Sequence, residues 1–125
     1  MNISDAEAPR RRWLRSQRFR LSALGNAAGA SYRDAIVAAR AEGGRRSFDE
    51  ARSAWARRLA LEPSDGLYLG ELRDGPRTLD ELATGLEGCG PQRSEVREVV
   101  ERLIRLTMLE LVIPPPPALP PPRRW

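Results

Sequence analysis

The chain has 125 residues with a formal net charge of +4, and 41% of them are hydrophobic, which is typical of one folded domain with a small core. No apolar run reaches the ~18 residues that a helix needs to span a bilayer, and the N-terminus lacks the apolar core of a secretory signal. We therefore expect a cytoplasmic protein without a membrane partner. All 21 positive residues are arginine, a bias typical of GC-rich bacterial genomes.

The N-terminal part of the chain is the basic part. Residues 1–62 hold 13 Arg against 7 acidic residues, whereas residues 63–125 hold 8 against 10. The first thirty residues are expected to form a basic arm or an amphipathic helix, because arginines are interleaved there with aromatic and aliphatic residues. These arginines are Arg10, Arg11, Arg12, Arg15, Arg18 and Arg20.

Residues 31–64 are predicted to form a helical extension of two helices. The segment from Ser31 to Asp34 has the pattern of a capping box, so a helix should begin there and run to about Glu42, where two glycines end it. The sequence around Pro63 breaks the helical pattern and marks an internal boundary. Four apolar residues recur at helical spacing before it and should form one buried face: Phe48, Ala51, Trp55 and Leu59.

Residues 65–113 are predicted to form three short helices and a terminal strand. The helices are expected over about residues 66–73, 79–86 and 94–106. A second capping box, Thr78 to Glu81, marks the start of the middle helix, and the apolar stretch 108–113 is short enough for a strand. Proline has no N–H to donate, so residues 114–125 should form an extended polyproline tail, which could serve as a spacer or as a ligand for an aromatic groove.

The second half of the chain resembles the winged helix-turn-helix superfamily over residues 65–113. The residues that carry this resemblance are Leu67, Leu69, Asp74-Gly75-x-Arg77-Thr78-Leu79-x-Glu81-Leu82-Ala83, Val96, Val99, Val100, Leu103, Leu106 and Leu109. Within that superfamily, the pattern is similar to the helical part of PqqD-like proteins, peptide chaperones that hold leader segments of ribosomally made natural-product precursors. The resemblance implies a mainly α fold, in which a helical N-terminal extension precedes a winged-helix-like three-helix module with a short terminal β-strand and a polyproline tail.

The first use that the resemblance implies is protein or peptide binding. If residues 109–113 form an edge strand, its free N–H and C=O groups can pair with an extended peptide while the preceding helix supplies side-chain pockets. Alternatively, the strand pairs within the domain and is closed to partners. The residues expected to form the peptide- or protein-binding site are Arg97, Glu101, Arg102, Arg105, Leu109, Leu111 and Val112.

The second use is DNA binding, with the third helix of the module in the major groove. Residues 65–113 contain 6 Arg and 10 acidic residues, so this body would be repelled by phosphates unless one face were locally basic. The nucleic-acid-binding candidates are therefore the arginines of the arm, although the arm could equally pack on the body. They are Arg10, Arg11, Arg12, Arg15, Arg18 and Arg20.

Residues that carry common catalytic chemistry are scarce. The sequence has no His and a single cysteine, Cys89, so the usual nucleophile–base pairs and histidine metal sites cannot be assembled. We expect no enzyme activity, cofactor or metal. The sequence favours a non-enzymatic regulatory or adaptor protein that binds a protein or peptide partner. A winged-helix DNA-binding transcriptional regulator is the alternative, and a homodimer is compatible with either.

Overall fold

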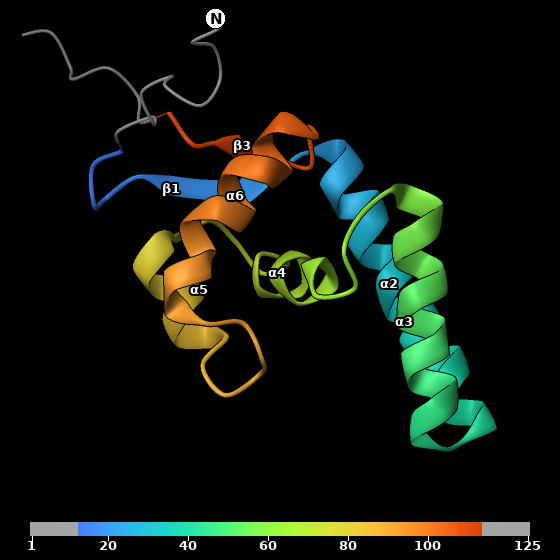
Figure 1. Ribbon diagram of the computed structural model, residues 1–125. Helices are drawn as coiled ribbons and strands as arrows, with labels where there is room; N and C mark the ends of the chain where they lie inside the picture. The colour runs from blue at the N-terminus through green and yellow to red at the C-terminus, as the bar shows by residue number, and fades with distance from the viewer. Residues whose placement is uncertain (1–12, 114–125) are drawn as a thin grey trace, which may run out of the picture.

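The computed structural model describes residues 13–113, which form a mainly helical fold with a small three-stranded antiparallel sheet (Figure 1). Arg10, Arg11, Arg12 and the predicted polyproline tail lie outside the described residues. None of the described helices is long and apolar enough to cross a membrane. In chain order the elements are β1 Arg18–Leu21, α2 Ala23–Glu42, α3 Arg45–Leu59, α4 Asp65–Glu71, β2 Arg77–Thr78, α5 Leu79–Gly85, the 3-10 helix η1 Arg93–Glu95, α6 Val96–Arg105 and β3 Leu109–Leu111.

The central strand of the sheet comes from the N-terminal side of the chain. The strand order is β2-β1-β3, and Arg20 of β1 lies opposite Glu110 of β3. Residues 18–21 therefore form a strand that packs on the body, and the expected amphipathic helix is wrong for them. Successive side chains of a strand point to opposite faces, so Phe19, which is fully buried, enters the core while its arginine neighbours face solvent.

Helices α2 and α3 form an antiparallel hairpin that extends away from the sheet (Figure 1). The predicted start of α2 at Ser31 is wrong, because the helix begins at Ala23, after Ser22, whose side chain accepts a hydrogen bond from the Gly25 N–H at 3.0 Å. The expected boundary between residues 30 and 31 thus falls inside a continuous helix. The predicted end at Glu42 is confirmed; Gly43 follows it with a positive φ of 80°.

An aromatic pair holds the hairpin together. The rings of Tyr32 in α2 and Trp55 in α3 meet edge to face with centroids 4.8 Å apart. The indole N–H of Trp55 donates to the Ser31 hydroxyl at 2.9 Å. Of the predicted apolar face of α3, Trp55 is buried, whereas Phe48 and Leu59 are only half-buried. The contact with α2 is therefore concentrated on one large side chain.

The body of the protein consists of the sheet and helices α4, α5 and α6. The predicted capping box at the start of α5 is confirmed, because the Glu81 N–H donates to the Thr78 hydroxyl at 3.1 Å and the Thr78 N–H donates to the Glu81 carboxylate at 2.8 Å. The predicted strand is also present, over Leu109–Leu111. The core of the body is formed by fully buried apolar side chains from the sheet and all three helices: Phe19, Leu69, Leu82, Val100 and Leu103.

Candidate functional site

A partly buried ion pair joins α6 to the start of α4. Arg102 donates from its two terminal nitrogens to both carboxylate oxygens of Asp65, at 2.7 Å each. Asp65 is fully buried and also accepts from the Glu62 N–H at 2.9 Å. The hydrogen bonds to Asp65 raise the pKa of Arg102, which stays charged. The guanidinium that we predicted to meet a partner is therefore engaged within the fold.

Arg97, on the same helix, supports an aromatic residue from the N-terminal side. Its guanidinium carbon lies 4.7 Å from the centroid of the Trp13 ring, and its Nε lies 3.4 Å from a carboxylate oxygen of Glu101. Trp13 in turn meets Phe19 edge to face, with centroids 4.7 Å apart. A cation over an indole face contributes about 0.5–1 kcal/mol where it is partly exposed. Arg97 thus helps to fix the segment that leads into β1.

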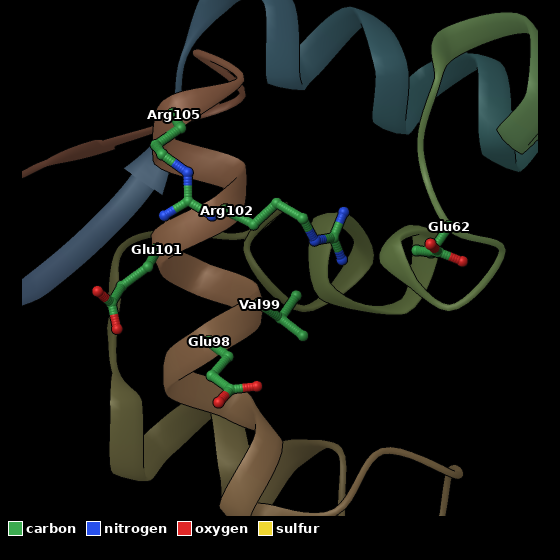
Figure 2. A pocket seen from close by; sticks show the side chains of 6 residues that line it. All are labelled: Glu62, Glu98, Val99, Glu101, Arg102 and Arg105. Atoms are coloured by element: carbon green, nitrogen blue, oxygen red, sulfur yellow. The ribbon is translucent and has the colours of Figure 1, made fainter. Parts of the chain in front are cut away.

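An open groove of about 500 Å³ runs along α6 (Figure 2). Figure 2 shows residues 98–105 of α6 on one side of it, with the carboxylate of Glu62 across from them. The guanidinium of Arg102 is paired with Asp65 and the carboxylate of Glu101 with Arg97, and the lining as a whole holds three carboxylates against two guanidinium groups, a small acidic excess. Its lining residues are Glu62, Glu98, Val99, Glu101, Arg102 and Arg105. An acidic groove disfavours contact with a phosphate backbone.

Strand β3 lies at one edge of the sheet. The Val112 N–H donates to the Arg18 carbonyl at 2.9 Å, and the Met108 carbonyl accepts from the Ser22 N–H at 3.0 Å. Because hydrogen-bonding direction alternates along an antiparallel strand, the N–H and C=O groups of Leu109 and Leu111 point away from β1. Within residues 13–113 no strand pairs with that side of β3.

The side chains of β3 divide between the two faces of the sheet. Leu109 is 2% exposed and Leu111 is half-buried against the core, so these two predicted site residues offer a partner mainly their backbone groups. Val112 is half-buried, and Ile113, which we did not predict as a site residue, is 85% exposed two residues beyond the end of β3. Arg105 lies in the last turn of α6, so one end of the groove adjoins the turn into β3.

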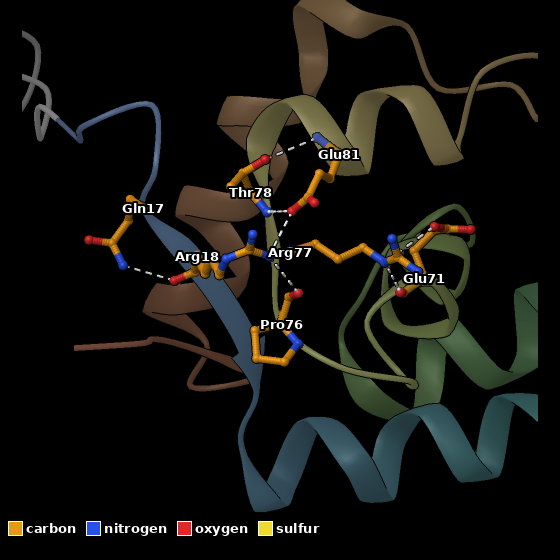
Figure 3. Close-up of polar contacts among 7 residues, drawn as sticks. All are labelled: Gln17, Arg18, Glu71, Pro76, Arg77, Thr78 and Glu81. Carbon is orange, nitrogen blue, oxygen red and sulfur yellow. Dashed lines mark hydrogen bonds and ion pairs between the residues drawn. The ribbon is translucent and has the colours of Figure 1, made fainter. Parts of the chain in front are cut away.

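The described arginines of the predicted nucleic-acid arm are exposed: Arg15 precedes β1, and Arg18 and Arg20 lie within it. Figure 3 shows Arg18 reaching from β1 toward α5, where it contacts the Glu81 carboxylate at 3.0 Å and the Pro76 carbonyl at 3.3 Å. Arg20 forms an ion pair with Glu110 at 3.0 Å. Arg15 is exposed. Two of the six predicted arginines are therefore engaged in pairs that tie the strands and α5 together.

Glu81 connects α5 to β1 through its ion pair with Arg18. The hydrogen bond from the backbone N–H of Thr78 lowers the pKa of Glu81, and the nearby positive charge of Arg18 lowers it further. The contacts of Glu81 stabilise the sheet and the start of α5.

Within residues 13–113, no group of three His, Cys, Asp or Glu side chains is placed to hold a metal ion.

Comparison of the chain with protein-family models, with curated proteins and with solved structures gives no match. The geometry of α6 and β3 is therefore the basis for the function proposed below.

Proposed function

We propose that this protein is a non-enzymatic adaptor that binds an extended segment of a protein or peptide as an additional strand on the open edge of β3. The observation that carries the proposal is the direction of the backbone groups of Leu109 and Leu111, which point away from β1 at an edge that no described strand covers. Main-chain hydrogen bonds at such an edge provide affinity, and side-chain pockets beside it provide specificity.

The surroundings of the edge support this use. The α6 groove ends at Arg105, directly before the turn into β3, and Ile113 leaves a large apolar side chain exposed beyond the strand. A bound strand would extend the sheet, so the side chains of the bound peptide would alternately face the helices and the solvent. The acidic groove and the engagement of Arg18 and Arg20 in ion pairs favour a peptide over DNA.

We further infer a winged-helix-like module in which β1 takes the place of a wing strand. The chain order α4, β2, α5, α6, β3 supports this assignment, and β1 fills the central position between β2 and β3. An N-terminal strand also supports the similarity to PqqD-like peptide-binding modules, since those modules begin with strands. We propose that the protein meets its peptide partner in the cytoplasm.

The test uses peptides selected against the full chain from a random phage-displayed library. Ile113→Pro removes an N–H that points outward by the same alternation, and it leaves the inward-facing N–H of Val112 in place. Ile113→Val retains the amide, the apolar side chain and the β-branched shape. Loss of one hydrogen bond should weaken selected peptides about five-fold in the proline variant, whereas the valine variant should bind within about two-fold of the parent.

The outcome that contradicts the proposal is equal binding of selected peptides to both variants, or no enrichment of any peptide. Backbone amide exchange adds a direct readout, because a bound strand should slow exchange at Leu109 and Leu111. Duplex DNA is titrated in parallel over a salt series. Affinity that falls steeply with salt and that exceeds peptide affinity would favour the DNA-binding alternative.

A further inference from the structure

A second cavity, of about 360 Å³, lies between α3, α4 and the loop that precedes α6. Polar side chains from three separate elements line it: Arg52 from α3, Tyr68 from α4 and Glu95 from η1. Ser64 contributes a hydroxyl, and Leu67 and Val99 contribute apolar wall. The cavity thus combines hydrogen-bond donors, one carboxylate and an apolar surface, and it is distinct from the edge of β3.

Two residues that line this cavity carry donors that have no hydrogen-bond partner within residues 13–113. One is the hydroxyl of Tyr68, whose side chain is 1% exposed. The other is the buried Nε of Arg52. Buried polar groups are nearly always hydrogen-bonded, because an unpaired one loses its hydration without compensation. Two such groups, both on residues that line one cavity, suit it to a ligand with hydrogen-bond acceptors.

Arg52 is available to such a ligand. Among residues 13–113 its one direct hydrogen bond runs from Nη2 to the Pro63 carbonyl at 3.3 Å, and its guanidinium carbon lies 5.9 Å from the Phe48 ring centroid. It forms no ion pair with the described residues. A guanidinium without a carboxylate partner is suited to a carboxylate ligand, which it can bind through two parallel hydrogen bonds. The weak internal contacts leave the side chain able to turn toward one.

Tyr68 supplies the second donor at neutral pH. Burial raises the pKa of Tyr68 above its ordinary value of 10.0, and the nearby carboxylates of Glu95 and Asp65 raise it further. The hydroxyl therefore stays protonated. Glu95 accepts the Gln92 N–H at 2.8 Å through one carboxylate oxygen. The other oxygen can accept from a cationic donor, and the negative charge disfavours a doubly charged phosphate.

We propose that this cavity binds a small zwitterion of the amino-acid class. Arg52 and Tyr68 donate hydrogen bonds to its carboxylate, Glu95 accepts from its ammonium group, and the ligand side chain lies against Leu67 and Val99. The site is independent of the proposed peptide edge, because neither the backbone of β3 nor Ile113 contributes to it.

The experiment is isothermal titration calorimetry of the full chain with each standard L-amino acid. The best binder is then compared with its N-acetyl form, which lacks the ammonium, and its amide, which lacks the carboxylate. Variants Arg52→Gln and Tyr68→Phe remove the two donors. Arg57→Gln is the matched control, since Arg57 is an exposed arginine of the same helix outside the cavity.

We expect saturable binding by at least one amino acid, weakened about ten-fold or more by Arg52→Gln and by the amide, as the loss of a charge-assisted hydrogen bond requires. Tyr68→Phe should also weaken binding, and Arg57→Gln should leave it unchanged. Circular dichroism checks that each variant is folded, and Tyr68→Phe carries the test if Arg52→Gln is not. Absence of saturable binding at millimolar concentrations, or binding that survives removal of both donors, overturns the proposal.

Discussion

The α2–α3 hairpin and the body are stabilised by different kinds of contact. The hairpin depends on one aromatic pair, Tyr32 with Trp55, and α2 is otherwise rich in alanine. Helix α2 continues from the hairpin to the body. The body combines strand pairing, a helix cap and the ion pair between Asp65 and Arg102. Removal of a single large side chain should therefore destabilise the hairpin most. The body should instead be destabilised by removal of the polar contact that joins two of its helices.

Trp55→Ala should give the largest effect. Trp55 is 1% exposed, so its removal leaves a cavity between α2 and α3 and should reduce the free energy of unfolding by about 3–5 kcal/mol. Chemical denaturation measures this change, and amide exchange should accelerate first in the hairpin. Val37→Ala, at a position 66% exposed on α2, is the control and should change stability by less than about 0.5 kcal/mol. Equal losses in the two variants would contradict the role of the aromatic pair.

Arg102→Met tests the body in the same way. The change leaves the Asp65 carboxylate buried without its cation, which should reduce the free energy of unfolding by about 3 kcal/mol. Arg105→Met alters an exposed arginine one turn further along α6 and should have an effect within about 0.5 kcal/mol. If urea unfolds the two variants at the same concentration, the ion pair does not stabilise the body.

The junction between hairpin and body depends on Gly25. A Cβ at this position would collide with the Met108 carbonyl oxygen, a backbone atom that cannot move aside cheaply. Gly25→Ala should therefore destabilise the protein by about 1–3 kcal/mol in thermal unfolding. Gly70→Ala, in α4 with open space around it, should instead stabilise by about 0.5–1 kcal/mol. A stabilising Gly25→Ala would show that α2 can separate from the turn before β3.

The smallest expected effect is a pH dependence at the start of α5. The folded state lowers the pKa of Glu81 below its ordinary value of 4.5. Its contribution is therefore present above pH 4.5 and is lost as the pH falls through the lower folded pKa. Glu81→Gln should lose less stability than the parent between roughly pH 5 and pH 3 in denaturation experiments. Identical pH profiles for the two proteins would remove Glu81 from the acid response.

Short-range signals in the sequence determined several elements. The capping box at Thr78, the end of α2 at Gly43 and the apolar strand before Pro114 were all predicted, because each depends on residues within about four positions of one another. The start of α2 was missed, since Ser31 resembles a cap but the hydrogen-bonded cap is Ser22. A serine followed by an acid is a local pattern that tertiary packing can override.

Only the tertiary structure decided the sheet and the surroundings of α6. Alternation in Arg18-Phe19-Arg20-Leu21 is a strand signal that the arginines of the arm obscured, and a four-residue strand forms only where distant partners accept its hydrogen bonds. The partner of Arg102 lies 37 residues earlier in the chain. The sequence therefore determined where helices are capped and where a strand is favoured. Compaction of the whole chain determined which edge of β3 stays open, because strand pairing and buried ion pairs join residues far apart in sequence.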